Sequence, residues 1–139
     1  MKDMVEKVHN AMDQQCRSRG FVAPVDVFMD IGVLDKKKFE DWRRGRIPYL
    51  EAVCSGSLHK LTEIMKVVHK YASQKGLKPS VTDYRQWGAK SRVLRFSKYG
   101  NPNVEKSYAT HYVDVNKKQR AKHDSVLQEQ PVPESPAAD

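Results

Sequence analysis

The segment from Val25 to Pro48 reads VDVFMDIGVLDKKKFEDWRRGRIP. Apolar residues recur at helical spacing before Gly32, and a second helical pattern follows Asp35. A glycine between two such patterns indicates a turn, because glycine adopts backbone conformations that other residues avoid. The segment therefore predicts two short helices joined by a turn.

The second of these helices has recognisable start and stop signals. Asp35 suits the N-cap, because its carboxylate can accept the free backbone N–H groups of the next turn. Phe39 and Trp42 follow at a spacing that places both on one helix face, so we expect Trp42 to pack into the core. Gly45 suits the C-terminal cap, and Pro48 cannot continue the helix.

This segment resembles the helix-turn-helix of phage-repressor-like regulators. Their second helix carries a capping residue, an apolar residue, a Trp and a Gly at fixed spacing, followed by a basic residue and a Pro. The corresponding residues of this chain are Asp35, Phe39, Trp42, Gly45, Arg46 and Pro48. The turn from Gly32 to Asp35 is one residue longer than the usual Gly-Val-Ser. The resemblance implies a DNA-binding domain whose second helix recognises the duplex.

Two other stretches are similar to segments of small bacterial proteins with no assigned function. They are DWRRGR at residues 41–46 and LRFSK at residues 94–98. Because those proteins have no assigned activity, this similarity implies nothing about mechanism.

The chain is strongly basic, with 25 Lys and Arg against 17 Asp and Glu and a formal net charge of +8. The surplus lies before residue 121, because the remainder holds Lys122 against Asp124, Glu129, Glu134 and Asp139. A surplus of positive charge raises the local concentration of polyanions, so nucleic acid is the first partner to consider. A basic protein without any nucleic-acid role is the alternative, since basic surfaces are common.

Length and composition indicate one globular domain, residues 1–116, and a charged tail, residues 117–139, which is predicted to be disordered. No apolar run is long enough for a signal peptide or a membrane span, so the expected location is the cytoplasm. Cys16 and Cys54 are expected to be reduced thiols rather than a disulfide or metal ligands.

Three further helices are predicted outside the central segment. The first begins near Met4 and ends near Gly20, and a longer one is capped by Ser57. The last begins with Asn101 as N-cap and Pro102 at the first helical position. Its expected apolar side consists of Val104, Tyr108, His111, Tyr112 and Val115.

Between the long helix and the last one, residue type alternates as in β-strands. The ranges 81–87 and 92–97 are predicted to form a hairpin joined by a Gly-containing link, residues 88–91. The predicted fold class is therefore mainly α, with a helix-turn-helix-like segment and one small β-hairpin. A basic hairpin would be compatible with a winged arrangement, although a long helix separates it from the helix-turn-helix-like segment.

Two groups of cations are candidates for nucleic-acid binding. The first lies in and just after the predicted second helix of the central segment: Lys36, Lys37, Lys38, Arg43, Arg44 and Arg46. Lysines in a first helical turn oppose the helix dipole, which favours a nearby external anion, although surface lysines are also common. Glu40 and Asp41 count against this site, because carboxylates repel phosphates. Arg43 and Arg44 could pair with them.

The second group lies in and around the predicted hairpin: Arg85, Lys90, Arg92, Arg95 and Lys98. These cations alternate with Tyr84, Trp87, Phe96 and Tyr99. Such interleaving is typical of single-stranded nucleic-acid sites, where bases stack on aromatic rings. Buried rings are the more frequent explanation, and we expect Trp87 and Phe96 to belong to the core.

An enzyme is not indicated. No phosphate-binding Gly loop, paired Cys motif or His-Glu-x-x-His motif is present, and the histidines are too scattered to predict a metal site or a cofactor. The sequence therefore predicts a non-catalytic nucleic-acid-binding protein, with duplex DNA preferred and RNA as an alternative. The runner-up is a protein-interaction adaptor whose basic face docks an acidic protein partner.

Overall fold

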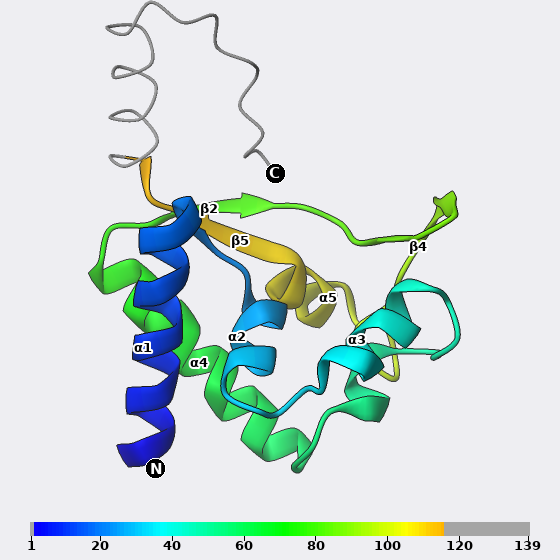
Figure 1. Ribbon diagram of the computed structural model, residues 1–139, viewed down its shortest axis with the longest axis horizontal. Helices are drawn as coiled ribbons and strands as arrows, with labels where there is room; N and C mark the ends of the chain where they lie inside the picture. Colours follow the sequence, from blue (N-terminus) through cyan, green and yellow to red (C-terminus); the bar gives the residue numbers. More distant parts are fainter. Residues whose placement is uncertain (1, 116–139) are drawn as a thin grey trace, which may run out of the picture.

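The computed structural model describes residues 2–115 (Figure 1). The helices are α1 (Lys2–Arg19), α2 (Pro24–Asp30), α3 (Lys36–Arg43), the 3-10 helix η1 (Leu50–Val53), α4 (Leu58–Gln74) and α5 (Pro102–Ala109). The strands are β1 (Phe21–Val22), β2 (Lys78–Val81), β3 (Arg85–Gln86), β4 (Ala89–Val93) and β5 (Thr110–Val113). The predicted tail, residues 117–139, lies outside the described residues.

Local signals place most of the helix ends where they were predicted. α1 ends at Arg19, directly before Gly20. At α4 the Ser57 hydroxyl accepts the Lys60 N–H at 3.1 Å, and at α5 the Asn101 side-chain oxygen accepts the Asn103 N–H at 2.9 Å. These caps satisfy backbone donors that have no partner inside the helix.

The helix-turn-helix-like segment contains both predicted helices, α2 and α3. Gly32 in the turn has φ +83°, and Gly45 after α3 has φ +78°, which explains glycine at both places. The predicted cap by Asp35 is wrong in detail, because its side chain accepts no capping hydrogen bond although its backbone is extended.

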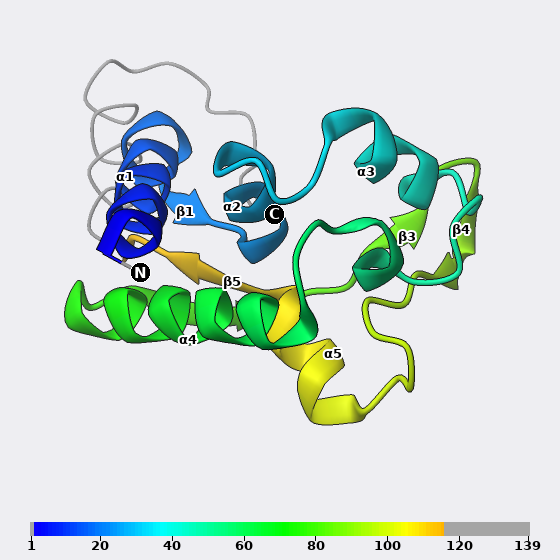
Figure 2. The same cartoon turned by 90° about the horizontal axis from the view of Figure 1, so that it is seen from below.

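The two helices of this segment have different packing partners. α2 contacts α1 and α5, whereas α3 contacts η1 and β3. Figures 1 and 2 show α3 together with β3 and β4 at one end of the molecule, away from α1. The resemblance to a DNA-binding helix-turn-helix stays a prediction.

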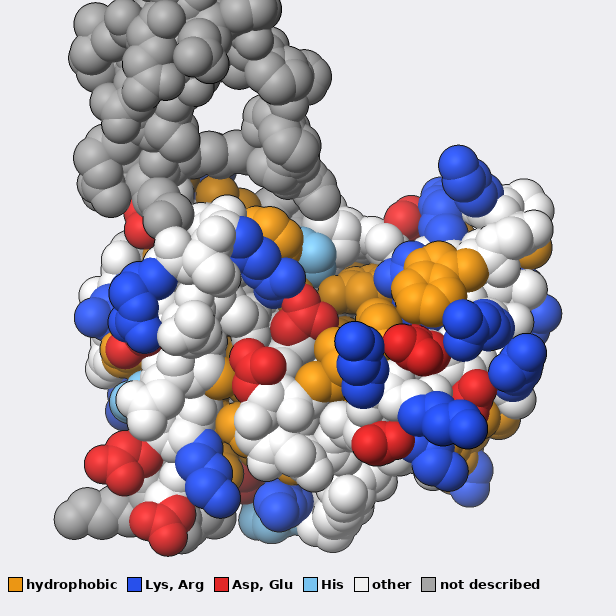
Figure 3. All heavy atoms as spheres, in the orientation of Figure 1, with side chains coloured by type: hydrophobic (Ala, Val, Ile, Leu, Met, Phe, Trp, Pro, Cys, Tyr) orange, Lys and Arg blue, Asp and Glu red, His pale blue; other side chains and the backbone are white. Residues whose placement is uncertain are grey.

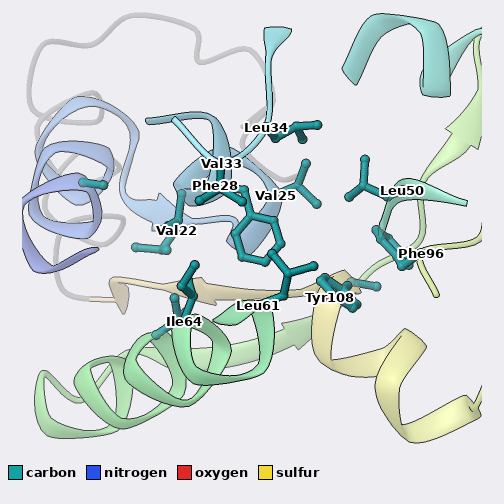
Figure 4. Packing of buried hydrophobic residues seen from close by; sticks show 14 of the residues in the cluster. Val22, Val25, Phe28, Val33, Leu34, Leu50, Leu61, Ile64, Phe96 and Tyr108 are labelled. Carbon is teal, nitrogen blue, oxygen red and sulfur yellow. The ribbon is translucent and has the colours of Figure 1, made fainter. Parts of the chain in front are cut away.

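The core lies where α1, α2, α4 and α5 meet, and Figure 4 shows its centre. The Phe28 side chain is fully buried and meets Tyr108 of α5 edge-on, with ring centroids 5.8 Å apart. Tyr108 stacks on Phe96 at 5.4 Å, and Phe96 lies 5.1 Å from Trp42 of α3. A continuous row of aromatic rings therefore connects the core to α3 and confirms that Trp42 and Phe96 are buried.

A three-stranded antiparallel sheet was not predicted. Its strand order is β1-β5-β2, so β5 lies in the centre and pairs with a strand on each side. The predicted last helix was therefore too long: α5 ends at Ala109, and residues 110–113 form β5 instead of continuing the helix. Thr110 and Tyr112 are buried while His111 and Val113 are half-buried, which is the alternation of a strand.

The hairpin exists but is shorter than predicted. β3 and β4 pair as an antiparallel two-stranded sheet, and the link is Trp87-Gly88 rather than residues 88–91. Gly88 has φ +85°, a conformation that a tight two-residue turn requires. The chain after Val93 leaves the strand, and Leu94 and Phe96 turn into the core.

Candidate nucleic-acid interface

The end of α3 and the hairpin are joined directly. The Trp87 backbone N–H donates to the Arg43 carbonyl at 2.7 Å. The Gln86 side chain lies against Gly45, where a side chain on residue 45 would collide with it. Two cationic segments that are about 40 residues apart in the sequence are therefore held as one unit.

Arg43 is the cation at the centre of this junction. Its guanidinium carbon lies 5.0 Å from the Tyr84 ring centroid and 5.2 Å from that of Trp87. Its Nε atom is buried without a hydrogen-bond partner among residues 2–115. Burial lowers the pKa of Arg43, while the nearby Tyr84 and Asp26 act in the opposite direction. A partly desolvated cation without a hydrogen-bonded anion gains if an external anion binds to its outer nitrogens.

The two arginines just after α3, Arg44 and Arg46, pair with the carboxylates of Glu40 and Asp41. Arg44 lies 3.9 Å from the Glu40 carboxylate, and Arg46 lies 3.3 Å from that of Asp41. Arg43 pairs with neither carboxylate. The ion pairs are exposed and contribute little to stability, but they reduce the repulsion that the carboxylates would exert on a phosphate.

The lysines of the α3 first turn remain available. Lys36, Lys37 and Lys38 are all exposed and form no ion pair within the described part of the chain. They lie at the N-terminal end of α3, one helix length from Arg43. Their charges therefore add to the positive charge that α3 carries at its other end.

The hairpin strands carry cations on an exposed ribbon. Arg85 pairs with Asp83 at 3.0 Å and donates through Nη1 to the Lys90 carbonyl at 3.0 Å. Lys90 and Arg92 are two residues apart in β4, so their side chains leave the same face of the ribbon. Figure 3 shows Lys and Arg side chains gathered around an apolar patch at this end of the molecule.

We call this surface the α3–hairpin face. It consists of Lys36, Lys37, Lys38, Arg43, Arg44, Arg46, Arg85, Trp87, Lys90 and Arg92.

Two predicted cations lie apart from the Arg43 junction. The Arg95 guanidinium carbon is 5.6 Å from the Tyr49 ring centroid, and Lys98 lies 5.4 Å from that of Tyr99. Lys98 also lines a groove of about 560 Å³ between α4 and α5, together with the exposed Leu58 and Tyr99. The predicted set of site residues is therefore divided between two regions.

The prediction that Trp87 belongs to the core is wrong, because 43% of the residue is exposed. Tyr84, which precedes it in the same alternating segment, is buried with 8% exposure. Because Trp87 belongs to the two-residue turn and not to a strand, strand alternation does not govern its burial.

Cys16 and Cys54 form no disulfide with each other. Burial, with a smaller contribution from Glu51, raises the pKa of Cys54 to about 12. A thiol with such a pKa is a poor nucleophile at neutral pH. Within residues 2–115, no cluster of three or more His, Cys, Asp or Glu side chains is arranged to hold a metal ion.

No protein-family profile, curated protein or solved structure matches this chain. None of the described helices is both long and apolar enough to cross a membrane.

Proposed function

We propose that this protein binds nucleic acid without catalysis, through the α3–hairpin face. The observation that carries the proposal is the junction at Arg43, which joins the two cationic segments into one surface and holds a partly desolvated guanidinium within it. Phosphates are the anions that such an extended cationic surface fits, because they repeat along a strand at regular spacing.

Salt dependence tests the proposal. Affinity for a short oligonucleotide should fall steeply as salt is raised, because bound phosphates release counterions. Equilibrium titrations of the full chain with duplex and single-stranded DNA and RNA across a salt series measure this slope. Absence of binding at low salt would refute the proposal. A protein that instead bound only an acidic polypeptide such as polyglutamate would match the adaptor hypothesis.

The three lysines of α3 provide a first variant. Changing Lys36, Lys37 and Lys38 to Gln should weaken nucleic-acid binding and lower the salt slope by up to about three, because each lysine can neutralise one phosphate. The fold should be retained, because Gln has a helix propensity close to that of Lys. Circular dichroism and the same titrations check both expectations.

A matched control removes the same charge elsewhere. Lys60, Lys66 and Lys70 are exposed on α4, which lies on the opposite side of the molecule from α3 (Figure 2). Their change to Gln should reduce affinity far less than the α3 variant does. Equal losses in the two triple variants would show that only net charge matters and that the α3–hairpin face is not the site.

A substitution of Arg43 should weaken nucleic-acid binding without lowering the free energy of unfolding. Changing Arg43 to Met removes the charge and keeps most of the volume that packs on Tyr84 and Trp87. The salt slope should fall by about one. The free energy of unfolding should stay the same or rise, because a desolvated cation without a hydrogen-bonded anion is replaced by an apolar group. Unchanged binding by the folded variant would remove Arg43 from the site.

A further inference from the structure

The Trp87 ring is held in place but left partly open. Within residues 2–115, its ring contacts come from α3 and its C-cap residue: Phe39 at 6.2 Å, Arg43 at 5.2 Å and Arg44 at 5.5 Å. The backbone bond from Trp87 to Arg43 fixes the turn that carries the ring. Part of the Trp87 side chain therefore packs on the end of α3, while 43% of the residue is exposed.

The groups around this ring suit a nucleotide. The guanidinium groups of Arg43 and Arg44 lie beside the ring. Glu40 is paired with Arg44, and Asp26, whose charge acts on Arg43, is paired with Arg19. A base can stack on the open side of an aromatic ring while neighbouring cations contact its flanking phosphates. Because α3 and the hairpin already hold the ring, little side-chain freedom would be lost on binding.

We propose that the α3–hairpin face takes single-stranded nucleic acid, with an unpaired base stacked on Trp87 and its flanking phosphates at Arg43 and Arg44. This inference rests on the proposed function. Paired bases in a duplex are stacked on each other and cannot cover the ring unless one leaves the helix, which costs energy. An acidic protein partner would satisfy the arginines but would leave the aromatic surface without a specific use.

The test compares two single strands that have the same number of phosphates with a duplex of the same length, which has more. These are an oligothymidylate of about 12 nucleotides, within the range that single-strand sites cover, an abasic strand of equal length, and a duplex of that length. At one moderate salt concentration, the full chain should bind oligothymidylate about 5- to 150-fold more tightly than the abasic strand. It should also bind oligothymidylate more tightly than the duplex.

Variants of Trp87 test whether this residue causes the preference for oligothymidylate over the abasic strand. Changing Trp87 to Leu should bring oligothymidylate affinity down to that of the abasic strand, whereas changing it to Phe should restore much of the preference. The abasic strand should bind all three proteins alike. A Leu variant that binds oligothymidylate as tightly as the unchanged protein overturns the inference.

Fluorescence tests the inference in the unchanged protein, should the Leu variant fail to fold. Trp42 is fully buried, so a soluble quencher such as acrylamide reaches mainly Trp87. Oligothymidylate should protect Trp87 from acrylamide, and the abasic strand should not. Absence of protection by bound oligothymidylate would contradict stacking.

The two proposals fail in different ways. Equal, salt-dependent binding of oligothymidylate and the abasic strand, or tighter binding of the duplex, overturns the stacking inference and leaves the proposed function standing. If no nucleic-acid probe binds at low salt, both fail. Tight binding of polyglutamate with no binding of any strand would assign the surface to an acidic protein.

Discussion

Replacement of Trp42 by Ala should reduce the free energy of unfolding by about 3–5 kcal/mol, the range for large aromatic residues removed from a core. The Trp42 side chain is fully buried and packs on Phe96 at 5.1 Å and Tyr84 at 5.5 Å. Its indole N–H donates to the Arg95 carbonyl at 2.8 Å. Urea unfolding followed by circular dichroism measures the loss.

A second substitution distinguishes the contribution of the Trp42 ring packing from that of its hydrogen bond. Trp42→Phe keeps most of the aromatic packing but leaves the Arg95 carbonyl without the indole donor, so a smaller loss of about 1–3 kcal/mol is expected. The Arg95 carbonyl also accepts the Leu50 N–H at 3.2 Å, which limits the damage. A loss below about 1 kcal/mol for Trp42→Ala would contradict the assignment of Trp42 to the core.

The second large effect is expected at Glu105 in α5. Its carboxylate accepts the Phe96 N–H at 2.9 Å, the Ser97 N–H at 2.7 Å and the Ser97 hydroxyl at 2.5 Å. Glu105→Ala leaves these part-buried donors without their acceptor, which should cost about 2–4 kcal/mol. The same unfolding measurement applies.

Two control substitutions test the explanation. Glu105→Gln keeps one acceptor oxygen and should cost less than Glu105→Ala. Lys106→Ala changes the adjacent, exposed residue of α5 and should have almost no effect, because Ala is a good helix former. Similar losses at both positions would mean that the contacts from Glu105 to residues 96 and 97 do not stabilise the loop.

The α3–hairpin face depends on the same aromatic packing. Tyr84, Phe96 and Trp42 contact one another, and Arg43 and Trp87 lie on the outer side of this group. A disturbance at Trp42 should therefore also weaken nucleic-acid binding. Binding measurements on Trp42 variants are informative about the site only when the variants are shown to be folded.

Several features of the fold were predictable because they depend on neighbouring residues alone. Ser57 and Asn101 cap their helices through hydrogen bonds to backbone groups within three residues. Gly45 follows the end of α3, because the chain there adopts a positive φ that glycine allows without strain. The spacing of Phe39 and Trp42 placed Trp42 in the core for the same reason: helical geometry relates residues within one or two turns.

Strand β5 shows where this local reasoning fails. Val104, Tyr108 and Tyr112 recur every four residues, which is also the spacing of a helix face. The chain nevertheless becomes extended at Thr110, where β1 and β2 supply hydrogen-bond partners on both sides. Those partners come from the distant residues 21–22 and 78–81, so no local pattern could reveal them.

The sequence alone determined the helix caps, the burial of Trp42 and the abundance of cations in two segments, since each follows from composition or from residues within a few turns. Tertiary structure decided which cations lie together. Contacts between residues 43 and 87 joined one group around Trp87, while Arg95 and Lys98 lie apart beside Tyr49 and Tyr99. The physical reason is that a shared surface depends on contacts between segments far apart in the chain, and neither spacing nor residue type encodes these directly.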